Sequence, residues 1–167
     1  MNNYKAIVLT ISDKGSRGER EDTGGPLVME ILEDEGIQVI GAEIIPDEKD
    51  IIKEKLIMIS ADPEVVLIMT TGGTGFAPRD VTPEATMEVC EKLVPGIPEA
   101  MRYESLKITK RAMLSRMVAG IRDNTLIINL PGSPKAIREN MDGILPALGH
   151  GLEMLVGKPR DCAEDRK

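Results

Sequence analysis

The glycine-rich segment Gly72-Gly73-Thr74-Gly75 has residue types and spacing that suit chemistry with an anion. It directly follows the apolar run 65–71, which is typical of a buried strand. Glycines let a backbone approach an anion and point its N–H groups at it. Shortly afterwards, Arg79 adds a guanidinium that can grip a phosphate, and Asp80 adds a carboxylate that can bind magnesium. The segment predicts an anion site; the alternative is a tight turn between a strand and a helix.

Neither of the two common nucleotide-binding glycine motifs fits this segment. The run from Gly73 to Pro78 lacks the last glycine of the dinucleotide-binding fingerprint, and no Gly-Lys-Ser/Thr of a Walker A loop occurs in the sequence. The acidic residue that would bind the ribose of a nicotinamide cofactor is missing as well. The sequence therefore disfavours a nicotinamide-dependent oxidoreductase.

A second carboxylate, Asp47, follows the apolar segment 37–45. Asp47 and Asp80 both come at the end of an expected strand, and magnesium takes one or two carboxylates together with substrate phosphates. Structural alternatives exist for both residues, because Asp47 can cap the helix that follows it and Asp80 can be a solvated loop acid. Thr82, with Pro83 at the first helical position, is a good N-cap, so capping does not require Asp80.

Two further segments offer groups for a substrate. Gly132 and Ser133 end an apolar run and open a helix, whose N-terminus can accept a phosphate with Lys135 nearby. A simple N-cap also explains Ser133. Ser12-Asp13 ends the first apolar run and leads into the polar stretch 14–25, which we interpret as a mobile substrate loop rather than a linker because of its length.

The histidine and cysteine content excludes several kinds of active site. His150 is the only histidine, and its apolar helical surroundings favour packing over catalysis. Cys90 and Cys162 are far apart, which argues against a zinc site or a disulfide scaffold. Ser115 is either a substrate contact or part of a surface turn.

Charge and composition narrow the partners. The 167 residues include 21 Lys and Arg against 28 Asp and Glu, and the net charge of −7 argues against binding to duplex DNA. Aromatic residues make up 2% and Trp is absent, which argues against stacking on single-stranded bases. We find no pattern of a signal peptide or of a membrane span of about 18 apolar residues. We therefore expect a cytoplasmic protein without a nucleic-acid or membrane partner.

Apolar runs that suit buried strands alternate with amphipathic helical patterns along the chain. The expected strands are 5–11, 37–45, 65–71, 117–121 and 125–130. The expected helices are 26–35, 50–60, 82–92, 98–106, 112–115, 133–140 and 145–155. This alternation predicts one α/β domain over residues 1–157 with a largely parallel sheet, followed by a charged tail at 158–167.

In such a sheet, ligands bind outside the carboxyl ends of the strands. The loops that follow four expected strands should therefore share one edge of the sheet. These loops are Ser12-Asp13, Pro46-Asp47, 72–80 and 131–133.

The segment 71–86 (TGGTGFAPRDVTPEAT) resembles the signature of the molybdopterin adenylyltransferase family. This family includes the bacterial Mog and MoaB proteins and the G domains of gephyrin and its plant counterpart. Other similar segments follow the family's order: ISD at 11–13, IPDE at 45–48, ESLKIT at 104–109, MLSR at 113–116 and LPGSPKA at 130–136. The resemblance extends from Ala6 to about Gly157.

The resemblance implies a three-layer α/β/α fold and a homotrimer. It implies that ATP, with Mg²⁺, adenylylates the terminal phosphate of molybdopterin and releases pyrophosphate during molybdenum cofactor biosynthesis. Asp47 and Asp80 would be the catalytic and metal-binding pair. The expected substrate contacts are Ser12, Asp13, Gly72, Gly73, Thr74, Gly75, Arg79, Ser115, Gly132, Ser133 and Lys135. Other molybdenum cofactor biosynthesis proteins are candidate partners, although the sequence does not identify protein partners.

The resemblance does not separate the Mog type from the MoaB type. The alternative to an enzyme is a molybdopterin-binding or scaffolding module of the MoaB type without turnover. Both interpretations keep the glycine segment, but only catalysis requires both Asp47 and Asp80, so the presence of both favours the enzyme. Transfer of this kind needs positioning and charge neutralisation more than a protein nucleophile, which suits the residues present.

Overall fold

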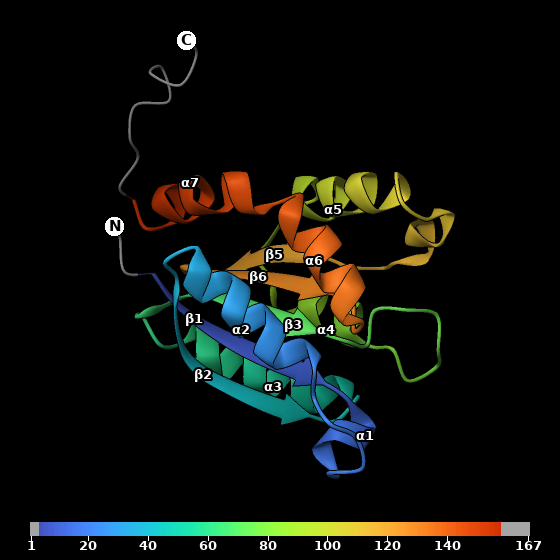
Figure 1. Cartoon of the computed structure of the whole chain (residues 1–167). Coiled ribbons are helices and arrows are strands. Elements are labelled where there is room, and N and C mark those ends of the chain that lie inside the picture. Colours follow the sequence, from blue (N-terminus) through green and yellow to red (C-terminus); the bar gives the residue numbers. More distant parts are fainter. Residues whose placement is uncertain (1–3, 158–167) are drawn as a thin grey trace.

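The computed structural model describes residues 4–157, in which helices cover both faces of a six-stranded sheet (Figure 1). The strands are β1 (Lys5–Ile11), β2 (Gln38–Ile45), β3 (Val65–Thr71), β4 (Lys92–Leu93), β5 (Ala119–Arg122) and β6 (Thr125–Leu130). Their order across the sheet is β2-β1-β3-β6-β5-β4. The first four of these strands pair in parallel, whereas β5 is antiparallel to both β6 and β4. The expected three-layer fold with a largely parallel sheet is confirmed.

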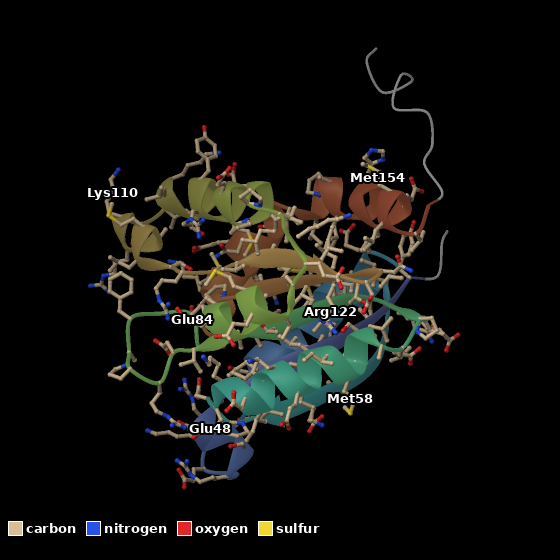
Figure 2. All side chains as sticks on the ribbon, turned by 180° about the vertical axis from the view of Figure 1, so that it is seen from behind. Glu48, Met58, Glu84, Lys110, Arg122 and Met154 are labelled. Carbon is tan, nitrogen blue, oxygen red and sulfur yellow. The ribbon has the colours of Figure 1, made fainter. Side chains whose placement is uncertain are left out.

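The helices form two outer layers of unequal size. They are α1 (Asp13–Ser16), α2 (Gly24–Asp34), α3 (Lys49–Ser60), α4 (Thr82–Val89), α5 (Gly96–Leu106), the 3-10 helix η1 (Lys110–Leu114), α6 (Pro134–Asp142) and α7 (Leu145–Leu155). Helices α2, α5, α6 and α7 pack on one face, and α3 and α4 on the other. Met154 on α7 and Met58 on α3 mark the two outer layers (Figure 2). No helix within residues 4–157 combines the length and the apolar character needed to cross a membrane.

The central strands are apolar throughout because both of their faces are covered. All seven residues of β3 are buried, as expected for a parallel strand between two helical layers. Along β1 the side chains alternate between layers: Val8 joins the cluster under α2, α5, α6 and α7, and Leu9 joins the cluster under α3 and α4. This alternation fixes the register of β1.

The expected helices and strands differ from the observed ones mainly in where they begin and end. The polar stretch 14–25 contains most of α1 and the start of α2. The expected helix 82–92 ends at Val89, because Lys92 and Leu93 pair with β5 as a short edge strand. A tight turn at Asp123, with φ of 50°, reverses the chain between β5 and β6 and makes this end of the sheet antiparallel. The charged tail at 158–167 lies outside the described residues.

One buried side-chain amide, that of Asn129, links three elements next to the glycine segment and the residue before β5. Asn129 on β6 is fully buried, and its Nδ2 donates to Thr70 Oγ1 on β3 at 3.0 Å and to Thr86 Oγ1 on α4 at 2.8 Å. Its Oδ1 accepts the N–H of Val118, just before β5, at 3.3 Å. This network holds α4 against the end of β3, where the glycine segment begins.

We predict that Asn129→Leu lowers the free energy of unfolding by about 2–3 kcal/mol, because it leaves the buried hydroxyls of Thr70 and Thr86 and the N–H of Val118 without their partner. Urea denaturation measures the change. The control is Asn124→Leu at the exposed turn before β6, which should change stability by about 0.5 kcal/mol or less. Equal stability of the two variants would contradict the prediction.

Candidate functional site

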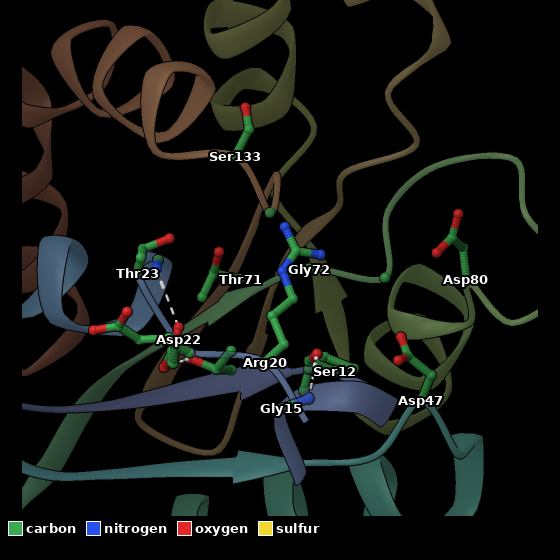
Figure 3. Close-up of a pocket in the computed structure, with 16 residues that line it drawn as sticks. Ser12, Gly15, Arg20, Asp22, Thr23, Asp47, Thr71, Gly72, Asp80 and Ser133 are labelled. Atoms are coloured by element: carbon green, nitrogen blue, oxygen red, sulfur yellow. Dashed lines mark hydrogen bonds between the residues drawn. The ribbon is translucent and has the colours of Figure 1, made fainter. Parts of the chain in front are cut away.

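A pocket of about 310 Å³ opens at the carboxyl ends of β1, β3 and β6 (Figure 3). Of the predicted site residues, its lining contains Ser12, Asp47, Gly72, Gly73, Asp80, Gly132 and Ser133. All four loops that were expected at this edge contribute to it. The predicted residues Asp13, Thr74, Gly75, Arg79, Ser115 and Lys135 do not line this pocket.

The floor of the pocket is the glycine pair that follows β3. Gly72 has a φ of 102° and Gly73 a φ of 65°, a backbone region in which side chains are strained. A Cβ on Gly72 would collide with the carbonyl oxygen of Ile11, and one on Gly73 would collide with Thr82 Oγ1. The N–H of Gly72 donates to Leu130 O at 3.1 Å, so this amide is not available to an anion. The N–H of Gly73 has no partner within residues 4–157 and belongs to the pocket lining.

Thr82 does not cap helix α4 as expected. The N-cap is Val81, and Thr82 is the buried first residue of the helix. Its Oγ1 donates to Gly72 O at 3.0 Å and its N–H donates to Gly73 O at 3.2 Å. The Thr82 side chain holds the glycine pair because the chain folds back so that Thr82 lies next to Gly72 and Gly73. Tertiary contact therefore overrides the local capping preference.

Asp47 and Asp13 hold each other through their backbones. The N–H of Asp13 donates to Asp47 Oδ2 at 2.8 Å, and the N–H of Asp47 donates to Asp13 Oδ1 at 3.1 Å. Asp47 does not cap α3, because the N-cap is Glu48. Burial raises the pKa of the Asp47 carboxyl, and the negative charges of Asp13 and Asp80 raise it further. The surroundings of Asp47 in the pocket therefore disfavour the charged form of its carboxyl.

Arg79 lies outside the pocket, and its guanidinium is paired with two carboxylates instead of being available to a phosphate. Its Nε and Nη2 donate to the two carboxylate oxygens of Asp13 at 3.0 and 2.9 Å, and Nη2 also donates to Glu48 Oε1 at 2.8 Å. The hydrogen bond from Arg79 lowers the pKa of Asp13. Asp13 is therefore neutralised from outside the pocket, whereas Asp47 and Asp80 are not.

Asp80 lines the pocket on the same side as Asp47 (Figure 3). Its Oδ2 accepts the N–H of Ala77 at 2.9 Å, which closes a turn of the glycine loop. No group of three or more His, Cys, Asp or Glu side chains within residues 4–157 is arranged to hold a metal. Asp47 and Asp80 are instead a pair, which suits a cation that takes its other ligands from a substrate.

Sequence reasoning missed Arg20, whose guanidinium reaches into the pocket (Figure 3). Arg20 is the one Lys or Arg side chain in the lining, and within residues 4–157 no hydrogen bond or ion pair engages it. The available signal was the polar stretch 14–25, which was expected to be a substrate loop. Asp22, at the end of this stretch, accepts the N–H groups of Gly24 and Gly25 at 3.1 and 2.9 Å and the Thr10 hydroxyl at 2.7 Å.

Ser133 caps α6 as expected and lines the pocket as well. Its Oγ accepts the N–H of Ala136 at 3.3 Å. Lys135 does not line the pocket: its side chain is 82% exposed, and its Nζ lies 3.9 Å from Glu139 Oε1. The helix N-terminus, rather than the lysine, faces the cavity.

Ser115 belongs to a second cavity of about 180 Å³ between α5, η1 and α6. Its Oγ, the Oγ of Ser105 and Oδ1 of Asn140 are buried without a hydrogen-bond partner, and all three residues line this cavity. Pro131 lines the second cavity and Gly132 lines the first, so the two cavities adjoin along this segment.

Neither Cys90 nor His150 offers a nucleophile to either cavity. Burial raises the pKa of the Cys90 thiol to about 11, so the thiol stays protonated at neutral pH. His150 lines neither cavity. Its side chain is exposed on α7, so the expectation that His150 packs in the core is wrong.

Comparison with known proteins agrees with this arrangement. The family model described as "Probable molybdopterin binding domain" matches residues 7–150. A molybdopterin adenylyltransferase of Helicobacter pylori strain J99 is 45% identical over 152 residues, covering 90% of this chain and 86% of the relative. The molybdopterin adenylyltransferase of Escherichia coli strain K12 is 41% identical over 158 residues, which cover 91% of this chain and 81% of the relative.

A solved structure is similar over nearly the whole chain. The molybdopterin biosynthesis enzyme MoaB of Thermus thermophilus superposes with a TM-score of 0.88 at 47% identity, covering 95% of this chain and 99% of that one. The fold agrees with that of this solved structure, and the family model spans residues 7–150, which is most of the chain. This chain therefore belongs to the molybdopterin-binding domain family, together with the molybdopterin adenylyltransferases.

Proposed function

We propose that this chain transfers the adenylyl group of ATP to the terminal phosphate of molybdopterin in molybdenum cofactor biosynthesis. A phosphate oxygen of molybdopterin attacks the α-phosphorus of ATP, the bond to the β-phosphate oxygen breaks, and pyrophosphate leaves. The observation that carries the proposal is the meeting of Asp47, Asp80, Gly73 and Arg20 in one pocket. The relatives named molybdopterin adenylyltransferase support the reaction.

Asp47 and Asp80 would hold Mg²⁺. The two carboxylates suit a cation because each repels the other, as shown by the raised pKa of Asp47, to which the charge of Asp80 contributes. The nearby Arg79 does not take the place of this cation, because its guanidinium is paired with Asp13 and Glu48. Two carboxylates leave coordination positions for substrate phosphates. When bound, Mg²⁺ neutralises the charge that builds up on the leaving pyrophosphate.

Arg20 and the N–H of Gly73 would bind the phosphates of ATP. The guanidinium has no protein partner within the described residues, and a phosphate accepts its paired N–H groups in a fork geometry. Gly73 offers an amide where a side chain would block approach. In a protein with a net charge of −7, this local arrangement offsets the general repulsion of an anion.

The second cavity would hold the pterin ring. Its buried Ser105, Ser115 and Asn140 have polar atoms without partners, and a pterin offers ring N–H, amino and carbonyl groups to satisfy them. Pro131 and Gly132 separate the cavities, so a phosphate attached to a ligand in the second cavity would enter the first beside the N-terminus of α6.

A molybdopterin-binding module without turnover is the alternative. It would need the second cavity and the glycine floor, but it would not require two carboxylates, Asp47 and Asp80, in the lining of the first cavity. The meeting of both carboxylates in this pocket therefore favours the enzyme over the module.

The proposal is tested by pyrophosphate release from ATP and molybdopterin in the presence and absence of magnesium. We expect magnesium-dependent release, and we expect Asp80→Asn to lower kcat by about 10²-fold or more, because it removes a charge that binds the metal. Its amide oxygen can still accept the Ala77 N–H, so the melting temperature should change little.

The matched control is Asp123→Asn in the exposed β5–β6 turn, at the opposite end of β6 from the pocket. It should keep wild-type turnover. Molybdopterin binding without pyrophosphate release in the wild-type protein would establish the binding module instead.

Asp47→Asn should separate function from stability. A raised folded-state pKa means that keeping the carboxylate charged costs folding free energy above that pKa, and that this cost disappears below the pKa of the unfolded chain. The variant removes the cost and keeps an oxygen for the Asp13 N–H. We expect it to lose turnover and to melt at the same or a higher temperature at pH 7.

The stability advantage of Asp47→Asn should shrink as the pH falls through the raised pKa of the wild-type Asp47 carboxyl, and it should vanish below the ordinary pKa that this carboxyl has in the unfolded chain. Thermal denaturation of both proteins across this range provides the measurement. A lower melting temperature of the variant at pH 7 would mean that Asp47 serves the fold.

We also infer a cytoplasmic homotrimer from the family resemblance. Multi-angle light scattering at micromolar concentration should give about three times the mass of the chain. A monomer under these conditions would contradict this inference and leave the adenylyl transfer assay to be judged separately.

A further inference from the structure

Arg116 is not explained by either cavity. It lies between η1 and β5, it lines neither pocket, and its side chain is only 32% exposed. Its hydrogen bonds instead lead to the loop between β3 and α4 and to the first turn of α4, more than 30 residues away in sequence. Figure 1 shows this loop, in green, extending away from the sheet.

The guanidinium of Arg116 connects the two ends of the loop tip. Its Nε donates to Gly75 O at 2.7 Å and its Nη2 donates to Asp80 O at 2.6 Å. The backbone N–H of Arg116 also donates to Thr74 O at 3.0 Å. The residues between these anchors include Phe76, which is 69% exposed. The base of the loop is therefore held from another part of the chain, while its tip is in solvent.

Glu84 orients the guanidinium. Nη1 of Arg116 forms an ion pair with Glu84 Oε1, in the first turn of α4. Figure 2 shows Glu84 on α4, near the loop. Three different nitrogens thus contact three acceptors on two sides of the loop. A planar guanidinium with donors in fixed directions can do this, whereas an ammonium group on a flexible stem cannot hold all three at once.

These contacts determine where the Asp80 carboxylate points. The carbonyl of Asp80 is bound by Arg116, its N–H donates to Ala77 O at 2.9 Å, and its Oδ2 accepts the Ala77 N–H at 2.9 Å. Gly75 permits the close approach, since a Cβ there would lie 2.8 Å from Asp80 Oδ2. Among residues 4–157, the hydrogen bond from Arg116 to this carbonyl is the one contact that anchors Asp80 from outside the loop.

We propose that Arg116 is the positioning residue of this loop: by holding the backbone of Gly75 and Asp80, it aims the Asp80 carboxylate into the pocket. Arg116 lines neither cavity, so its effect on the reaction would pass through Asp80. The consequence for turnover rests on the proposed adenylyl transfer, whereas the consequence for the loop does not. The two consequences are tested by separate measurements.

The first measurement is limited proteolysis with chymotrypsin. Phe76 is the only phenylalanine of the chain, so cleavage after it gives fragments of residues 1–76 and 77–167 that mass spectrometry identifies. Tyr103 on α5 is 65% exposed and serves as an internal reference site. We expect Arg116→Gln and Arg116→Lys to be cut after Phe76 at least several-fold faster than wild type, with cleavage after Tyr103 unchanged.

The second measurement is the magnesium dependence of pyrophosphate release. A displaced Asp80 should raise the magnesium concentration for half-maximal rate and lower kcat by about 10²-fold, the effect of a displacement near 1 Å. A general loss of folded protein would lower the rate without moving the magnesium requirement. Arg116→Lys should be as defective as Arg116→Gln, because it keeps the charge but not the fork.

The matched control is Arg122→Gln. Arg122 is also a partly buried arginine that donates to a backbone carbonyl, Val89 O at 3.0 Å, but at the far end of α4 (Figure 2). It should leave both the Phe76 cleavage rate and the magnesium requirement unchanged.

Unchanged cleavage after Phe76 in both Arg116 variants would overturn the proposal, and so would equal acceleration at Phe76 and Tyr103, which indicates general unfolding. An unchanged magnesium requirement, with faster cleavage at Phe76, would overturn the link to Asp80. If the wild-type protein released no pyrophosphate, the proposed function would fail, and the cleavage pattern alone would decide whether Arg116 holds the loop.

Discussion

The close approach of three strand ends at Gly72 is the constraint on which the site depends. Its N–H is bonded to Leu130 at the end of β6, and its Cα faces the carbonyl of Ile11 at the end of β1, with no room for a side chain. A parallel sheet brings these ends to one edge, but helices on both faces and covered strands are needed to hold them there. The pocket floor is backbone because nothing larger fits.

The charged side chains around this floor differ in whether they are paired within the protein. Arg79 forms an ion pair with Asp13 at the rim, whereas Asp47 and Asp80 line the cavity without an ion pair among residues 4–157. Arg20 is the opposite case, a guanidinium without an acid among the described residues. Charged groups of both signs that lack an ion-pair partner among the described residues, gathered in one pocket, are typical of a ligand-binding site.

The loop that carries Asp80 shows how rigidity can be supplied from a distance. Its tip is exposed, but its base is held by Thr82 at Gly72 and by Arg116 at Gly75. Behind it, Asn129 joins β3, β6 and α4 through buried hydrogen bonds. Buried polar contacts of this kind specify one arrangement, because any other would leave polar groups unpaired.

The sequence by itself determined the α/β class, the succession of strands and helices along the chain and the edge of the sheet at which the pocket forms. Apolar runs that alternate with amphipathic segments are local signals, and a strand followed directly by Gly72-Gly73 or by Ser12, Asp47 or Ser133 places those residues at the carboxyl edge. The separated motifs identified the family for the same reason, since each is a continuous stretch of chain.

Only the tertiary structure decided which side chain is used for what. Arg79 satisfies acids and Arg20 enters the pocket, although both are exposed arginines in polar loops. Thr82 holds the glycine pair rather than the helix end, and Ser115 faces a separate cavity. These assignments depend on partners that are distant in sequence, and no local pattern records the distance between residues that only folding brings together.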